Sequence, residues 1–150
     1  MAQSYVQTTY QVVFATKYRQ PTLLKPLRAQ LFAYMAGTLR NKKCTVFEVG
    51  GVEDHVHLLF HLHPSVALAS LVKDIKLSAS EFIKDHPLAF PCFAGWQRGY
   101  GAFTYSAKAR PRLIRYVQNQ EEHHRTETST DELRRFLAEH GIEYNDYYFE

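Results

Sequence analysis

Four histidines alternate with apolar side chains in one short segment, DHVHLLFHLH at residues 54–63. Successive side chains of a β-strand point to opposite faces of a sheet, so the alternation predicts a strand with one apolar face and one histidine face. Two imidazoles two residues apart lie about 7 Å apart on such a face, which lets both rings approach one divalent cation. His57 and His61 are about 13 Å apart, so the strand offers two pairs, His55 with His57 and His61 with His63.

The alternation also has a simpler interpretation, in which the strand is half solvated and its polar face happens to be histidine. For an isolated pair of histidines this interpretation would be preferred. Pro64 follows His63 immediately, so we interpret His61 and His63 as the partly solvated end of the strand. The interpretation of His55 and His57 therefore depends on residues elsewhere in the chain.

Tyr116 and Gln120 stand four residues apart in a segment, residues 111–125, that we predict to be one helix, so they share a helix face. Alone, a helical tyrosine usually belongs to the core and a glutamine to the surface. With His55 and His57 they compose a candidate site, because two imidazoles and an amide oxygen could hold a divalent cation. Such a cation acts as a Lewis acid on a phosphodiester, which the phenol of Tyr116 could attack to form a covalent intermediate.

Few of these candidate ligands are anionic, which suits Mg²⁺ or Mn²⁺ only when the substrate itself supplies negative charge. His123 and His124 lie one turn beyond Gln120 and could compete with it as ligands. Three other phenols could approach the site, those of Tyr18, Tyr100 and Tyr105.

The predicted elements follow one another as strand, helix, strand, strand, helix, strand, helix and helix. Gly50-Gly51 marks the turn of an antiparallel hairpin that leads into the histidine strand. Strands paired about a central hairpin, with helices packed on the sheet, predict an α+β fold of the ferredoxin-like or RRM-like kind. The apolar face of the histidine strand should meet the helices, which leaves the histidine face for chemistry or for another element. The strands are predicted at residues 9–16, 45–49, 54–63 and 102–106.

Local features predict where the helices begin and which side chains are solvated. Ser65 is a candidate N-cap for the helix over residues 68–83, where apolar residues recur at helical spacing. Ser129 and Glu132 have the spacing of a capping box for a final helix that ends at Gly141. Arg28 is expected on the solvent side of the first helix.

Length and composition predict one domain of 150 residues, with a C-terminal helix and tail from about residue 129. Hydrophobic residues make up 45% and charged residues 22%, as in ordinary globular proteins. A formal net charge of +3 permits a polyanionic partner without requiring one. The tail over residues 142–149 is too aromatic to be plain disorder, so we expect it to dock on the domain.

Cysteine use and hydropathy indicate a cytoplasmic protein. Cys44 and Cys92 lie far apart without zinc-finger spacing, so we interpret them as free thiols in a reducing compartment. No apolar run has the length of a membrane span, and the N-terminus lacks the pattern of a signal peptide.

Basic residues and aromatic rings gather in the second half of the chain. Between residues 107 and 116 there are four cations, Lys108, Arg110, Arg112 and Arg115, and no acidic residue. Aromatics beside a basic run suit single-stranded nucleic acid, whose bases stack and whose phosphates pair with cations. An equally good interpretation is a hydrophobic turn followed by the solvated start of a helix.

Taken in order, these blocks resemble the single-tyrosine HUH transposases of the smallest bacterial insertion sequences, the TnpA type, and their REP-associated relatives. The resemblance covers nearly the whole chain. It is carried by Thr16-Lys17-Tyr18-Arg19 after the first strand, Asp54-His55-Val56-His57-Leu58-Leu59, Trp96-Gln97-Arg98-Gly99-Tyr100, and Tyr116-Val117-Gln118-Asn119-Gln120. A histidine pair by itself is a weak motif, but in this order and with a downstream Tyr-x-x-x-Gln it is strong.

The resemblance implies an HUH fold with His55, His57 and Gln120 as ligands of Mg²⁺ or Mn²⁺ and Tyr116 as nucleophile. It implies a DNA transposase that cleaves and rejoins single-stranded DNA at insertion-sequence ends, through a 5′-phosphotyrosine and a free 3′-OH. The ends would be DNA hairpins, and the protein a homodimer whose tyrosine helix can complete the partner's site. By location, the expected DNA-binding residues are Lys17, Arg19, Trp96, Arg98, Tyr100, Lys108, Arg110, Arg112 and Arg115.

Two other functions remain as alternatives. A domesticated relative could be a non-catalytic module that binds a nucleic-acid hairpin without cutting it, although the presence of all four candidate catalytic and metal residues argues against this. A zinc hydrolase could use His55 and His57, but the sequence shows no third histidine, cysteine or carboxylate at metalloenzyme spacing.

Overall fold

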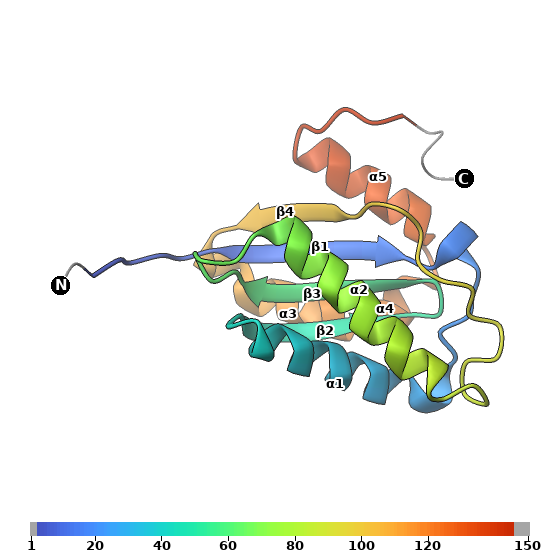
Figure 1. The fold of residues 1–150 in the computed structure, drawn as a ribbon. Helices are drawn as coiled ribbons and strands as arrows, with labels where there is room; N and C mark the ends of the chain where they lie inside the picture. Colours follow the sequence, from blue (N-terminus) through green and yellow to red (C-terminus); the bar gives the residue numbers. More distant parts are fainter. Residues whose placement is uncertain (1–2, 146–150) are drawn as a thin grey trace.

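Four strands form one antiparallel sheet in a computed structural model that describes residues 3–145 (Figure 1). Across the sheet the order is β2 (Thr45–Gly51), β3 (His55–His61), β1 (Thr9–Ala15) and β4 (Gly101–Tyr105). The histidine strand β3 is therefore central, with β1 and β2 both antiparallel to it. The register places Ala15 opposite His55 and Val13 opposite His57.

Helices cover both faces of the sheet. On one face lie α1 (Lys25–Asn41) and α2 (Leu68–Lys84), and on the other lie α3 (Arg110–Gln118), α4 (Gln120–His123) and α5 (Ser129–Glu139) (Figure 1). Two 3₁₀ turns, Lys17–Arg19 and Ala107–Ala109, follow β1 and β4. The α+β architecture expected from the sequence is confirmed. Within the described residues, none of the helices is both long and apolar enough to cross a membrane.

The main apolar core lies between the sheet and helices α1 and α2. Val56, Leu58 and Phe60 of β3 point into it and are fully buried. Leu31 and Met35 of α1 meet them there, together with Leu71 and Ile75 of α2. The expectation that the apolar face of the histidine strand meets helices is confirmed.

The β2–β3 turn lies two residues later than the sequence suggested. Gly50 and Gly51 are paired residues of β2, opposite His57 and Val56, and the turn covers residues 52–54. A Cβ at Gly50 would lie 2.6 Å from the carbonyl oxygen of Val117. Glycine is therefore needed here because α3 packs directly on the β2 backbone, not because the chain turns.

Three local predictions are wrong. Ser65 is not the N-cap of α2; Ala67 occupies that position, and the Ser65 hydroxyl contacts His63 instead. The helix predicted over residues 111–125 is broken at Asn119, which separates α3 from α4. Arg28 is buried rather than solvated, because its guanidinium donates to the Leu23 carbonyl and pairs with a carboxylate of α4.

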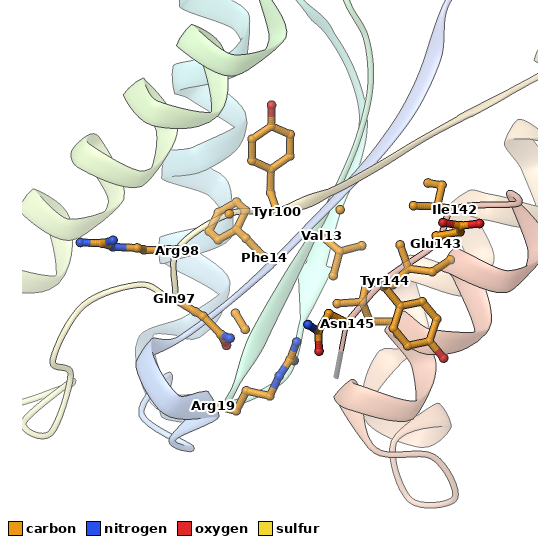
Figure 2. A pocket seen from close by; sticks show the side chains of 15 residues that line it. Val13, Phe14, Arg19, Gln97, Arg98, Tyr100, Ile142, Glu143, Tyr144 and Asn145 are labelled. Carbon is orange, nitrogen blue, oxygen red and sulfur yellow. The ribbon is translucent and has the colours of Figure 1, made fainter. Parts of the chain in front are cut away.

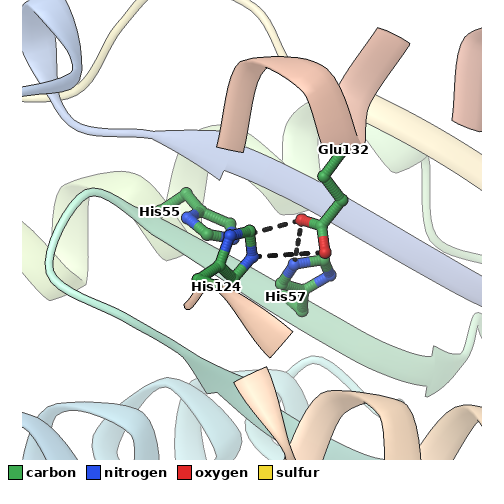
Figure 3. Close-up of side chains that lie close together, drawn as sticks. All are labelled: His55, His57, His124 and Glu132. Carbon is green, nitrogen blue, oxygen red and sulfur yellow. Dashed lines mark hydrogen bonds and ion pairs between the residues drawn. The ribbon is translucent and has the colours of Figure 1, made fainter. Parts of the chain in front are cut away.

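The capping box predicted at the final helix is also wrong. Thr128 is the N-cap of α5, and its hydroxyl accepts a hydrogen bond from the backbone N–H of Asp131. The side chain of Glu132 is therefore not needed at the helix end. It is buried and points at the histidine face of the sheet (Figure 3).

Candidate active site

His55 and His57 lie side by side on the face of β3 that α3, α4 and α5 cover, and both are fully buried. Their ring centroids are 5.0 Å apart. His55 Nδ1 is 2.7 Å from the Asp54 carboxylate, and His57 Nδ1 is 2.7 Å from Oε1 of Gln11. Both partners are acceptors, since the Gln11 amide nitrogen donates to Tyr105, so each neutral imidazole carries its proton on Nδ1. The Nε2 atoms of both rings then point into the same space.

The chain's own helices cover the histidine face, which the sequence had left open for another element. Gln120 at the start of α4 places Oε1 3.2 Å from His55 Nε2. Glu132 of α5 places Oε1 2.9 Å from His57 Nε2 and 3.2 Å from His55 Nε2. His124, directly after α4, completes the group, with its ring centroid 4.5 Å from that of His55 (Figure 3).

Sequence reasoning missed Glu132 because it assigned this residue to a helix cap. One available signal was its spacing from Phe136, which places a carboxylate on the same side of α5 as a buried aromatic ring. A charged residue in the apolar stripe of a helix is seldom buried without a partner. The partners here are the imidazoles of β3.

Tyr116 of α3 meets the same carboxylate. Its hydroxyl donates a short hydrogen bond to Glu132 Oε2, and its ring lies 6.0 Å from that of His57. Arg135 of α5 donates to the phenol oxygen at 2.8 Å and is itself held by Glu127. Although Asn119 interrupts the helix, the side-chain amide of Gln120 still donates from Nε2 to the backbone carbonyl of Tyr116, 3.2 Å away. The structure thus brings together all four residues that the sequence assigned to catalysis and metal binding.

Burial and charge act differently on the two imidazoles. Burial opposes the charged form of His55, but its hydrogen bonds to Asp54 and Glu132 outweigh burial and raise the pKa of His55 to about 9. For His57, burial is the largest effect and lowers its pKa to about 4, despite the Glu132 carboxylate. His57 is therefore neutral at physiological pH, with a lone pair on Nε2.

The pKa values of Tyr116 and Glu132 are shifted in opposite directions. Burial, with the hydrogen bond to the anionic Glu132, raises the pKa of Tyr116 well above its ordinary value of 10, and Arg135 opposes this. Burial also opposes the anionic form of Glu132, but hydrogen bonds from His124, His55 and His57 outweigh burial and lower the pKa of Glu132. The site therefore holds a buried carboxylate that stays charged.

These residues fit a divalent cation. Imidazole nitrogens, an amide oxygen and a carboxylate converge from one strand and two helices, and each is a common ligand of such ions. The Nδ1 atoms of His55 and His57 donate to acceptors outside the cluster, as the imidazoles of metal ligands usually do. Residue spacing in the sequence showed no third histidine or carboxylate near His55 and His57. In the fold, His124 and Glu132 lie beside them.

Three other histidines that the sequence offered as possible ligands lie in two different places. His61 contacts the backbone and hydroxyl of Thr8, and His63 contacts Ser65, which agrees with a strand end outside the site. His123 lies 3.1 Å from the Tyr116 hydroxyl and 2.7 Å from a Glu127 oxygen.

The predicted DNA-binding residues form two groups at opposite ends of the sheet. The first group surrounds a pocket of about 540 Å³ between the loop before β4 and the segment after α5 (Figure 2). Arg19, Arg98 and Tyr100 line this pocket, and Tyr144 lines its other side. Residues 142–145 of the aromatic tail line this pocket but are exposed, so docking of the tail stays a prediction; its last residues, 146–149, lie outside the described range.

Two members of this first group have structural contacts. Trp96 donates its indole N–H to the Lys76 carbonyl and packs edge-on against Phe14, so it supports the loop rather than presenting a free ring. Arg19 donates to the Ser129 hydroxyl, which donates to the same Asp54 carboxylate that holds His55. Arg19 therefore connects the pocket with the histidine site, while Lys17 and Arg98 remain exposed.

The second group follows the other end of β4. Lys108, Arg112 and Arg115 are exposed. Arg110 is half-buried, donates to Thr9 and stacks its guanidinium 4.4 Å from the ring centre of Phe47. Any DNA that contacts both groups must therefore extend along the length of the sheet.

Comparison with known proteins adds three findings. The family model described as "Transposase IS200 like" matches residues 4–120. The ISDra2 transposase TnpA of Deinococcus radiodurans is 25% identical over 118 residues, which cover 76% of this chain and 84% of that protein. The family match ends at Gln120, so it includes Tyr116 and both histidines but not α5.

Two solved structures have a similar fold. One is described as a transposase from Deinococcus radiodurans R1; it has a TM-score of 0.61 and 25% identity, and the match covers 80% of this chain and 96% of that one. The other is a REP-associated tyrosine transposase bound to a REP hairpin, with a TM-score of 0.58 and 16% identity over 83% of this chain and 73% of that one. The second supports the fold alone.

Proposed function

Because the chain belongs to the IS200-like transposase family, we propose that it cleaves and rejoins single-stranded DNA through a 5′-phosphotyrosine on Tyr116. One observation carries the proposal: the Tyr116 hydroxyl donates to the same buried Glu132 carboxylate that contacts both His55 and His57.

The residues around Tyr116 support its role as nucleophile. The phenol donates a hydrogen bond to Glu132, which raises the pKa of Tyr116, whereas Arg135 donates to the phenol oxygen and favours negative charge on it. The phenol oxygen attacks phosphorus and loses its proton to solvent, the bond from phosphorus to the 3′ oxygen breaks, and the 3′ oxygen takes a proton from solvent. Rejoining is the reverse of this step, so it needs no external energy source.

We propose that His55, His57 and Gln120 hold a divalent cation next to the phosphate. Such a cation, Mg²⁺ or Mn²⁺ in this proposal, would polarise a phosphate oxygen and stabilise the charge that develops during transfer. The protein contributes orientation, since Asp54 and Gln11 fix the two imidazoles and Tyr116 fixes the Gln120 amide.

The pocket of Figure 2 is the proposed entry for single-stranded DNA. Arg19 and Arg98 can pair with phosphates, and the rings of Tyr100 and Tyr144 offer stacking surfaces. Arg19 also contacts Ser129 at the edge of the histidine site, which supports a path from the pocket to Tyr116. A DNA hairpin at the element's end is the proposed substrate, in line with the printed description of the REP-associated relative.

In this fold the tyrosine helix covers the histidines of its own chain, which supports cleavage by a single subunit. The homodimer implied by the family resemblance stays a prediction. Light scattering of the purified protein with and without hairpin DNA would test it, and mixing Tyr116→Phe with His57→Ala subunits would reveal an exchange of tyrosine helices, because only exchange restores cleavage.

The direct test uses labelled single-stranded oligonucleotides that cover hairpins flanking the gene, with Mg²⁺ or Mn²⁺. Wild-type protein should give a covalent protein–DNA adduct on a denaturing gel, and Tyr116→Phe or chelation should abolish it. An adduct that persists in Tyr116→Phe would assign the nucleophile to another tyrosine. Hairpin binding without any adduct would favour the non-catalytic binding module.

A further inference from the structure

His124 and Glu132 lie in the histidine site but have no role in a site made of His55, His57 and Gln120. His124 directly follows α4, and Glu132 lies in α5. Both are beyond the part of the chain that the family model matches. One donor atom from each of His55, His57, His124 and Glu132 lies within 4.8 Å of the other three (Figure 3). This separation is short enough for all four atoms to bind one ion.

The orientation of His124 matches that of the two strand histidines. Its Nδ1 lies 2.6 Å from the carbonyl oxygen of Glu127, which can only accept, so Nδ1 carries the proton of the neutral ring. Its Nε2 then presents a lone pair to Glu132 Oε2 at 3.2 Å and to Gln120 Oε1 at 2.8 Å. His55, His57 and His124 thus each donate Nδ1–H outward and direct Nε2 inward, the arrangement found around bound metal ions.

With each ring in the neutral form that binds metal ions, the inward-facing atoms are all acceptors. Three Nε2 lone pairs surround the two oxygens of Glu132, which is almost completely buried. Gln120 adds a fifth acceptor, because its amide nitrogen donates elsewhere, to the Tyr116 carbonyl. A buried carboxylate needs positive charge beside it, from protonated imidazole or from a bound cation. A divalent cation supplies this charge and gives every lone pair a partner.

We propose that His124 and Glu132 are ligands of this cation together with His55 and His57, so that the site has three imidazoles and a carboxylate. This proposal rests on the proposed function, in which DNA cleavage depends on a metal ion. It makes His124 and Glu132 the ligands in place of Gln120, which is then no longer required as one. Gln120 then orients His124 through its amide oxygen.

Such a ligand set selects a class of ion. Mg²⁺ prefers oxygen ligands and retains water, whereas three imidazoles with one carboxylate suit borderline ions such as Co²⁺ and Zn²⁺, and bind Mn²⁺ less tightly than these. The cation would also connect β3, α4 and α5 within one chain. Because Arg135 and Glu132 reach Tyr116 from α5, binding of the ion would fix the groups around the nucleophile as well.

The test measures metal binding without DNA, using the full chain stripped of metal by chelation. Calorimetric titration with CoCl₂, MnCl₂ and MgCl₂ should show one tight site for Co²⁺, weaker binding of Mn²⁺ and the weakest binding of Mg²⁺. Glu132→Gln and His124→Gln should each weaken Co²⁺ binding by about 100-fold, the upper end of what is lost when groups supporting a metal site are removed. The visible absorption of bound Co²⁺ should change in both variants.

Matched controls separate ligation from folding. Asp131→Asn removes an exposed carboxylate one residue before Glu132, and His86→Gln removes a histidine on the other side of the sheet; both should bind Co²⁺ like wild type. Hydrogen exchange gives a second readout, since Co²⁺ should slow exchange in α5 of the wild type but not of Glu132→Gln. Thermal unfolding without metal shows whether each variant is folded.

Two outcomes would overturn the proposal. Wild-type affinity in Glu132→Gln and His124→Gln, with binding lost in His55→Ala and Gln120→Ala, would restore the two-histidine and amide site. Mg²⁺ binding as tight as Co²⁺ binding would overturn the proposed preference of the site for Co²⁺ over Mg²⁺. Failure of the proposed function is recognised separately: four-ligand Co²⁺ or Zn²⁺ binding without any DNA adduct would leave this inference standing and would favour the zinc hydrolase.

Discussion

The two faces of β3 are buried to the same extent but differ in what burial does. Val56, Leu58 and Phe60 face α1 and α2, and His55 and His57 face α3 to α5; all five are fully buried. On the first face, removal from water stabilises the fold directly. On the second, removal from water costs free energy, shifts pKa values and makes every interaction with a charge stronger. One face is the core of the domain, and the other is the candidate site.

The polar face is held together by specific partners, whereas the apolar face relies on packing. Asp54, Gln11 and the Glu127 carbonyl each fix one imidazole, and Glu132 meets all three. Substitutions on the two faces should therefore be separable: those on the polar face should change chemistry more than stability, and those on the apolar face should do the opposite.

The largest effect is expected from Tyr116→Phe on the polar face. Loss of the nucleophilic oxygen should reduce adduct formation by about 10³-fold or more, because the oxygen removed is the one held between Glu132 and Arg135. Adduct formation is measured by quenched time courses on denaturing gels. The thermal unfolding temperature of the same variant should shift only slightly. A loss of adduct formation much smaller than about 10³-fold would contradict the assignment of Tyr116.

On the apolar face, Leu58→Ala should lower the free energy of unfolding by about 3 kcal/mol, since it leaves a cavity at a fully buried position. Urea denaturation followed by circular dichroism measures this loss. The adduct rate per folded molecule should remain within about threefold of wild type. A rate loss as large as that of Tyr116→Phe would show that the two faces are not separable.

Arg135→Met tests the electrostatic support of the nucleophile. Arg135 opposes the rise in the pKa of Tyr116, so its removal should raise that pKa further. The rate of adduct formation at neutral pH should fall by about 10- to 100-fold. The pH at which this rate begins to rise should also be higher than in the wild type. The pH–rate profile is the measurement, and Arg134→Met on the same helix is the matched control. An unshifted profile would restrict Arg135 to a packing role.

The smallest effect is expected at the caps that sequence reasoning misassigned. Thr128→Ala removes the N-cap of α5 and should cost about 1 kcal/mol in urea denaturation. Ser65→Ala should cost less than about 0.5 kcal/mol, because Ser65 does not cap α2. Equal losses in the two variants would contradict the assigned caps.

The sequence alone was sufficient for the properties that depend on periodicity. Alternation over residues 54–63 determined which side chains of β3 face the core, and the order of elements determined the α+β class. The spacing of Tyr116 and Gln120 gave a shared face that survives the break at Asn119. These inferences hold because strand and helix geometry dictates side-chain direction within a few residues.

Residues distant in the chain were decided only by the tertiary structure. Glu132 reads as a local cap in the sequence, but it lies 75 residues from His57 in the chain and 2.9 Å from it in space. The sequence placed Arg28 wrongly on the solvent side and left the role of His124 open. In both cases the partners of the side chain come from other elements. Side-chain direction is a local property, whereas the partner of a buried charge depends on how helices pack across the sheet. Packing of α4 and α5 on the sheet therefore determined which residues join His55 and His57.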